Sequence, residues 1–146
     1  MKKLNRKGFT LVELLAVIVI LAIVVGITLV TVLPTLKKSR QEAFELTAQT
    51  AADFFEKNYQ LYIIGERDSI PDELKTAFAN LGTAKNFDEK MYTLAGLKKD
   101  NYATGTWKID TATGRACVTL TPSSDGEYYD ATGPKSSTGC SLNNNN

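Results

Sequence analysis

Few residues in this chain are arranged for bond-making chemistry. The sequence contains no histidine, which removes the usual Ser-His and Cys-His nucleophilic pairs, and it has no glycine-rich phosphate loop of the G-x-x-x-x-G-K type. The paired acids Asp72-Glu73 and Asp88-Glu89 suit acid–base chemistry, but acids at helix starts and on solvated surfaces are far commoner. We therefore expect no enzyme activity and no cofactor.

A loop near the C-terminus carries the oxygen donors that a calcium site would need. The run Ser123-Ser124-Asp125-Gly126-Glu127 is followed closely by Asp130, and oxygen atoms are the ligands that Ca²⁺ prefers. The spacing matches no EF-hand pattern. A plain turn is the preferred interpretation, and we expect no metal site.

A single carboxylate interrupts the long apolar run near the N-terminus. From Phe9 to Leu33 the sequence reads FTLVELLAVIVILAIVVGITLVTVL, in which Glu13 is the one ionisable residue. An apolar helix of about 20 residues spans a bilayer, so this run predicts a membrane helix. A carboxylate inside it costs on the order of 2.5 to 3.5 kcal/mol on insertion scales. We therefore interpret Glu13 as functional, with snorkelling to the interface as the alternative.

The charges are distributed unevenly along the chain. The net charge is +1, but four of the 17 basic residues lie in the first seven positions, namely Lys2, Lys3, Arg6 and Lys7. Without them 13 basic residues face 16 acidic ones, a net charge near −3, which argues against a nucleic-acid binder that depends on phosphate contacts. The basic leader outweighs Lys37, Lys38 and Arg40 beyond the apolar run, which favours a cytoplasmic N-terminus.

The elements that position these residues begin with one long helix, predicted from Thr10 to Ile63. Its first half is apolar on all sides, whereas its second half carries an apolar stripe at three- and four-residue steps, formed by Phe44, Thr47, Ala48, Ala51, Phe55, Tyr59 and Tyr62. Between the halves, Gly26 and Pro34 predict a helix break, either a kink or a locally unwound segment.

The remaining chain predicts a small mixed head. A short helix is expected over Pro71 to Asn80, followed by strands over Met91 to Leu97, Tyr102 to Asp110 and Arg115 to Thr121, with a short edge strand at Tyr128 and Tyr129. In the third strand Ala116, Val118 and Leu120 alternate with Cys117 and two threonines, so Cys117 lies on the opposite face. The fold class is therefore α+β, a long helix packed on an antiparallel meander.

The junction between the leader and the apolar run resembles the type IV prepilin signature. A basic leader ends in Gly8, Phe9 follows, and Glu13 stands four residues further on inside the apolar helix. The resemblance implies that a prepilin peptidase cuts between Gly8 and Phe9 and methylates the new Phe9 amine. Residues 1–8 would then be a cleaved leader, 9–36 a transmembrane and filament-core helix, and 37–146 a globular head.

Cys117 and Cys140 are the two cysteines of the chain. In an exported head they most simply form a disulfide, which closes a loop of about 24 residues and is worth roughly 3 kcal/mol in the loop-entropy model. Free thiols and a metal site are the alternatives, and the second lacks any histidine.

The resemblance also implies a mechanism of assembly. The Phe9 amine would pair with Glu13 of a neighbouring subunit, giving a homo-oligomeric helical filament that the pilus assembly machinery builds from a pool in the cytoplasmic membrane. The expected function is a structural subunit of an extracellular type IV pilus, or fimbrium, in cell adhesion, twitching motility or DNA uptake. A pseudopilin of a type II secretion or competence apparatus, or a membrane-anchored binding domain that does not polymerise, are the alternatives.

Overall fold

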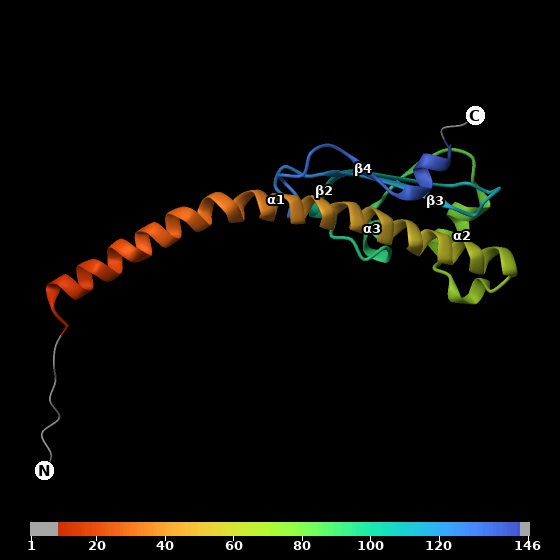
Figure 1. The fold of residues 1–146 in the computed structure, drawn as a ribbon. Helices are drawn as coiled ribbons and strands as arrows, with labels where there is room; N and C mark the ends of the chain where they lie inside the picture. The colour runs from red at the N-terminus through yellow and green to blue at the C-terminus, as the bar shows by residue number, and fades with distance from the viewer. Residues whose placement is uncertain (1–8, 144–146) are drawn as a thin grey trace, which may run out of the picture. The chain divides into compact units, whose positions relative to one another are not determined.

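The computed structural model describes residues 9–143 of the chain. The chain divides into two compact units after Lys38, and each is described separately below. The elements in chain order are α1 Leu11–Ile64, η1 Arg67–Ser69, α2 Asp72–Ala79, β1 Lys85–Asn86, α3 Glu89–Leu94, η2 Lys99–Asn101, β2 Tyr102–Ile109, β3 Ala116–Pro122, β4 Lys135–Ser136 and η3 Thr138–Asn143 (Figure 1). Because α1 runs to Ile64, it contributes residues to both units.

The second unit is built on a four-stranded antiparallel sheet in the order β1-β2-β3-β4. The two long strands, β2 and β3, form a hairpin in which Trp107 lies opposite Val118. The Asp110 carboxylate holds the connecting turn by accepting hydrogen bonds from the Ala112 amide, at 3.0 Å, and the Thr113 hydroxyl, at 2.7 Å. Gly114 completes the turn with a φ of +73°, a left-handed conformation that favours glycine.

The core lies between this sheet and the part of α1 that follows residue 38. Phe55 of α1 stacks on Trp107 of β2 with ring centroids 4.5 Å apart. Three alanines on the same helix face, Ala48, Ala51 and Ala52, are fully buried, and their small size lets the helix backbone approach the sheet closely. The α+β fold, a long helix packed on a small antiparallel sheet, is therefore confirmed.

The helices α2 and α3 pack on the same side of the sheet as α1 (Figure 1). Phe78 of α2 contacts the rings of Tyr59 and Trp107. Tyr92 of α3 contacts Phe87 and stacks on Tyr102 of β2. The predicted helix over Pro71 to Asn80 is present as α2, with Pro71 at its N-cap.

Two of the predicted strands are wrong. Met91 to Leu97 lies largely in α3, because the Asp88 carboxylate accepts a hydrogen bond from the Met91 amide at 2.7 Å and caps a helix start there. Tyr128 and Tyr129 lie in a turn. The Tyr128 ring packs there in an aromatic cluster, with its centroid 5.1 Å from that of Phe44. The edge strands are instead β1 and β4, which have two residues each.

Candidate processing and assembly site

The start of α1 is formed by residues on either side of the predicted cleavage point. Gly8 and the leader lie outside the described residues, so the structure begins at Phe9. The Phe9 side chain is 87% exposed, and the helix starts two residues later at Leu11. Glu13 lies in the first helical turn, four positions from the predicted new amine.

Glu13 and Thr10 form a reciprocal pair that closes the helix start. The Glu13 Oε2 atom accepts a hydrogen bond from the Thr10 amide and another from the Thr10 hydroxyl, both at 2.9 Å. In return the Glu13 amide donates to the Thr10 hydroxyl oxygen at 3.3 Å. This arrangement is a capping box, which satisfies backbone donors that an α-helix leaves free at its N-terminus.

Thr10 is the residue of this site that sequence reasoning missed. The signal was present as Thr10-Leu11-Val12-Glu13, a capping-box pattern directly before an apolar run. The sequence prediction for Glu13 concerns its charge in the apolar run and its pairing with a neighbouring Phe9 amine. The capping box gives it a second, local role, because one carboxylate oxygen is satisfied within its own chain without snorkelling to the interface.

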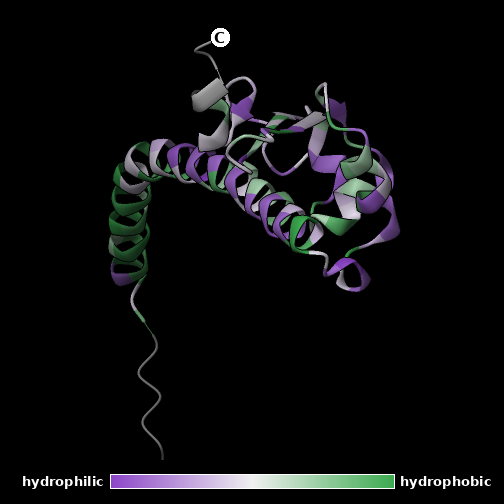
Figure 2. Ribbon diagram, turned by 90° about the vertical axis from the view of Figure 1, so that its right-hand side faces the viewer, coloured by the Kyte–Doolittle hydropathy of each residue, from purple (hydrophilic) through white to green (hydrophobic). Residues whose placement is uncertain are grey.

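The helix surface that follows is exposed and contacts no other element among the described residues. Every large apolar side chain from Phe9 to Leu36 is at least 47% exposed, and Figure 2 shows this part of α1 as a nearly continuous hydrophobic stretch. Among the residues described, α1 is the one helix that is long and apolar enough to cross a membrane, judged by length and composition. So large an apolar surface requires lipid or other protein chains to cover it.

The stretch between Gly26 and Pro34 is helical throughout, without an unwound segment. Pro34 has no amide hydrogen, so the Val30 carbonyl lacks its usual helical donor. Nearby hydroxyls add bonds to the helix backbone: Thr28 donates to the Val24 carbonyl at 3.0 Å, and Thr35 donates to the Thr31 carbonyl at 3.0 Å. A helix break at these positions therefore stays a prediction about the assembled subunit.

Cys117 and Cys140 form a disulfide. It joins β3 to η3 on the sheet face opposite the core, because Cys117 alternates with the buried residues Ala116 and Val118. The segment before Cys140 is also bound to β3 through Ser137. The Ser137 amide donates to the Val118 carbonyl at 2.8 Å, and its hydroxyl donates to the Ala116 carbonyl at 3.1 Å.

The same C-terminal segment is bound to the second half of α1. Lys135 forms an ion pair with Glu45 at 2.6 Å. The Gln49 side-chain oxygen accepts hydrogen bonds from the amide and hydroxyl of Thr138, at 3.0 and 2.9 Å. The segment is thus fixed on one side by the disulfide and on the other by the helix.

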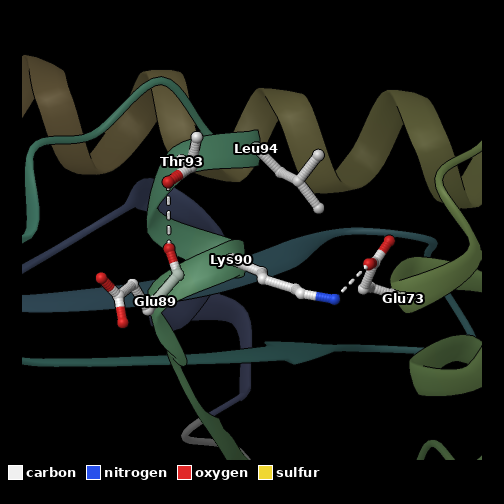
Figure 3. A pocket seen from close by; sticks show the side chains of 5 residues that line it. All are labelled: Glu73, Glu89, Lys90, Thr93 and Leu94. Carbon is white, nitrogen blue, oxygen red and sulfur yellow. Dashed lines mark hydrogen bonds and ion pairs between the residues drawn. The ribbon is translucent and has the colours of Figure 1, made fainter.

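The acidic pairs occupy structural positions. Asp72 pairs with Lys75 at 2.8 Å, and this hydrogen bond and the lysine charge lower the pKa of the Asp72 carboxyl. Glu73 pairs with Lys90 at 3.0 Å beside an open pocket between α2 and α3, which Glu89, Thr93 and Leu94 also line (Figure 3). Asp88 caps α3, and Glu89 lies beside it in the first turn.

The acids of the late loop are directed to separate partners. Asp130 pairs with Arg40 of α1 at 3.2 Å, whereas Glu127 accepts a hydrogen bond from the Asn101 side chain at 3.3 Å. Within residues 9–143 no group of three or more acidic or cysteine side chains is placed to hold a metal ion.

The chain matches the family model described as the prokaryotic N-terminal methylation motif over residues 3–29. No curated protein and no solved structure matches the chain. The matched range contains leader residues 3–8, which include Gly8, together with Phe9 and Glu13, so it covers the predicted processing site. The chain therefore carries the type IV prepilin signature, which supports a protein of the type IV pilin or pseudopilin family.

Proposed function

We propose that this chain is a structural subunit of a type IV pilus, a helical extracellular filament whose core is formed by residues 9–36 of many copies. The observation that carries the proposal is the exposed, continuous apolar surface of this stretch, joined to a head that buries its own core. Such a surface needs a cover, and identical helices from neighbouring subunits supply one once the subunit leaves the membrane. The methylation motif supports prepilin peptidase processing and assembly machinery as partners.

The assembly step uses a charge pair that cleavage creates. Removal of the leader gives Phe9 a free amine, positive at neutral pH because its reference pKa is near 8. Among packed apolar helices this amine and the Glu13 carboxylate of a neighbour neutralise each other, and a subunit in the wrong register leaves a buried charge unpaired. Breaking such a pair costs about 3 to 5 kcal/mol, so Glu13 fixes the register of each incoming subunit.

The capping box is compatible with this role. The two bonds from Thr10 both go to Oε2 of Glu13, so the other carboxylate oxygen is left to receive the amine of a neighbouring chain. The helix start can remain closed while the pair forms. Subunits joined amine to carboxylate associate head to tail, a heterologous contact that generates an open helical filament.

The predicted break between Gly26 and Pro34 fits the same proposal. The missing donor at Pro34 weakens the helix locally, and residues 26–34 are all exposed in the described part of the chain. We propose that the helix extends or bends here as the subunit enters the filament, which lets the head adjust to its place on the surface.

Two substitutions separate the charge of Glu13 from its capping role. Glu13→Gln keeps a capping-box residue but removes the charge, so the protein should be inserted and cleaved while the filament yield falls roughly 100-fold or more. Thr10→Val removes the cap and keeps the charge, and filaments should persist. The yield is measured by negative-stain imaging with an antibody to the head. A normal yield from Glu13→Gln would contradict the proposed pairing.

The same imaging distinguishes a pseudopilin, which carries the same motif, from a pilus subunit. Long surface fibres labelled along their length support the pilus subunit, and their absence in cells that process the leader supports a pseudopilin. An uncleaved leader at Gly8, read by mass spectrometry, would instead indicate a membrane-anchored binding domain.

A further inference from the structure

An open cleft lies in the head where α2, β1 and α3 meet. Its volume is about 440 Å³, which is within the range of roughly 300 to 1,000 Å³ for pockets that bind small molecules. Trp107 lines it from the sheet, and Ala77 of α2 and Met91 of α3 give it apolar walls. The cleft contains no residue of the processing and assembly site, so it has no part in the function proposed above.

The indole nitrogen of Trp107 is the observation that points to a ligand. Trp107 is only 1% exposed, and a tryptophan buried to this extent usually finds a partner for its N–H group. This N–H forms no hydrogen bond to any residue in the described part of the chain. Among the same residues, Oδ1 of Asp130 is the side-chain atom that is sealed from solvent without a partner. The indole N–H is therefore not sealed, and it opens to the cleft that Trp107 lines.

A positive charge lies beside this donor on the sheet side of the cleft. Lys85 of β1 is directly opposite Trp107 in the strand register, so the two side chains leave the sheet on the same face. Both residues line the cleft, and Lys85 forms no ion pair within the part of the chain that the structure describes. An N–H donor and an ammonium group thus face the cleft from neighbouring strands.

Negative charges line the cleft on the helix side. Glu73 lies in the first turn of α2, and Asp88 is the N-cap of α3. Lys90 binds Oε1 of Glu73, and the Met91 amide binds Oδ1 of Asp88. A carboxylate has two acceptor oxygens, so each of these groups can accept a further hydrogen bond from a ligand.

This distribution of charge selects the chemistry of the ligand. The Trp107 N–H and the Lys85 ammonium group suit a carboxylate, whereas Glu73 and Asp88 suit an ammonium group. A simple anion would meet the two carboxylates, and a simple cation would meet the lysine. A small molecule with one charge of each sign complements both sides, and the apolar walls suit an apolar side chain.

We propose that the cleft binds a free α-amino acid with an apolar side chain. Its carboxylate lies toward Trp107 and Lys85, and its ammonium group lies toward Glu73 and Asp88. The inference does not depend on filament formation, because the cleft lies within the head and uses no residue of the apolar helix.

The test uses the full-length chain in detergent micelles, with L-leucine as the probe. Trp107 is the single tryptophan, so the protein gives one indole N–H signal in a proton–nitrogen NMR spectrum. Added L-leucine should shift this signal until the site is saturated. Isocaproate, which lacks the ammonium group, and isoamylamine, which lacks the carboxylate, should each bind at least about tenfold more weakly, because each loses a charge-assisted bond.

Substitution of Lys85 tests the sheet side of the cleft. Lys85→Met removes the charge and keeps an unbranched side chain, so the affinity for L-leucine should fall about tenfold. Lys85→Arg keeps the charge and should retain binding. The matched control is Lys108→Met, because Lys108 is exposed and follows Trp107 in β2, so its side chain lies on the other face of the sheet. This control should bind like the wild type.

Substitution of Glu73 tests the helix side. Glu73→Gln should weaken binding about tenfold, whereas Asp72→Asn loses an ion pair of the same helix outside the cleft and should not. Urea unfolding verifies the fold of each variant. No saturable shift with L-leucine, equal affinity for isocaproate, or unchanged binding by Lys85→Met would each overturn the proposal. None of these outcomes depends on Glu13 or on filaments, so the proposed pilus function is tested separately.

Discussion

Gly105 of β2 is placed where only a hydrogen side chain fits. A Cβ atom at this position would lie 2.8 Å from the Tyr92 hydroxyl, 3.0 Å from the Phe87 ring and 3.1 Å from the Leu120 side chain. Gly105→Ala should therefore lower the free energy of unfolding by about 1 to 3 kcal/mol, a typical cost of overpacking. Urea unfolding followed by the fluorescence of Trp107, the single tryptophan, measures this change.

The control for this prediction is Gly82→Ala. Gly82 has open space around its Cα, and its φ is not in the left-handed region, so an added methyl meets nothing. Its unfolding midpoint should match the wild type. Equal midpoints for both variants would mean that Tyr92 and Phe87 can move aside, and the packing of α3 on β2 would then be looser than described.

Tyr102 makes the head sensitive to alkaline pH. Burial among aromatic rings raises the pKa of its hydroxyl well above the usual value. Because this pKa is higher in the folded state, the free energy of unfolding is unaffected below pH about 10. Above that pH the tyrosine ionises first in the unfolded chain, which lowers the free energy of unfolding by at most about 1.4 kcal/mol per pH unit. Tyr102→Phe should flatten this decline. Unfolding midpoints at several alkaline pH values would show whether the slopes differ.

At the scale of elements, the disulfide ties the C-terminal segment to the sheet. Cys117 and Cys140 are separated by 23 positions, and a loop of this length is worth roughly 3 kcal/mol in the loop-entropy model. The double substitution Cys117→Ser and Cys140→Ser should lower the free energy of unfolding by about that amount. Reduction of the wild type should have the same effect in urea unfolding. An unchanged midpoint would indicate that Glu45, Gln49 and Ser137 hold the segment without the bond.

The elements predicted correctly are those whose sequence pattern is long enough to be read. α1 follows from its apolar run and stripe, and β2 and β3 follow from alternation around a turn. By contrast, β1 and β4 have two residues each and exist because a longer strand pairs with them. The apolar residues of α3 suit a strand as well as a helix, and the cap at Asp88 is what decides for the helix.

Only part of the candidate site can likewise be predicted from the sequence. Glu13 was identifiable because a lone charge in an apolar run is conspicuous, and the matched motif includes its position. Its bonds to Thr10 depend on how the chain enters the helix, which the run itself does not specify. The pairing of Glu13 with a neighbouring Phe9 amine stays a prediction, since it concerns contacts between chains.

At the scale of the whole molecule, the two parts of α1 are stabilised in different ways, one by packing and the other by an apolar environment. Residues 39–64 of α1 depend on packing against the head, because Phe44, Phe55 and Tyr59 are buried there. In the preceding stretch of the same helix, from Leu11 to Lys38, every described residue is exposed. In a micelle or bilayer, however, its backbone hydrogen bonds face no competing water, which favours the helix independently of the head.

This difference predicts two separate transitions on heating the full chain in detergent micelles. Trp107 fluorescence should change in one cooperative step as the head unfolds, while far-UV circular dichroism should retain the ellipticity of the helix over residues 11–38. The variant without the disulfide should lower the fluorescence midpoint by roughly 10 to 20 °C and leave the retained ellipticity unchanged. If all helical signal instead disappears together with the Trp107 transition, the apolar helix depends on the head for its structure, and it would not wait in the membrane as an independent element ready for assembly.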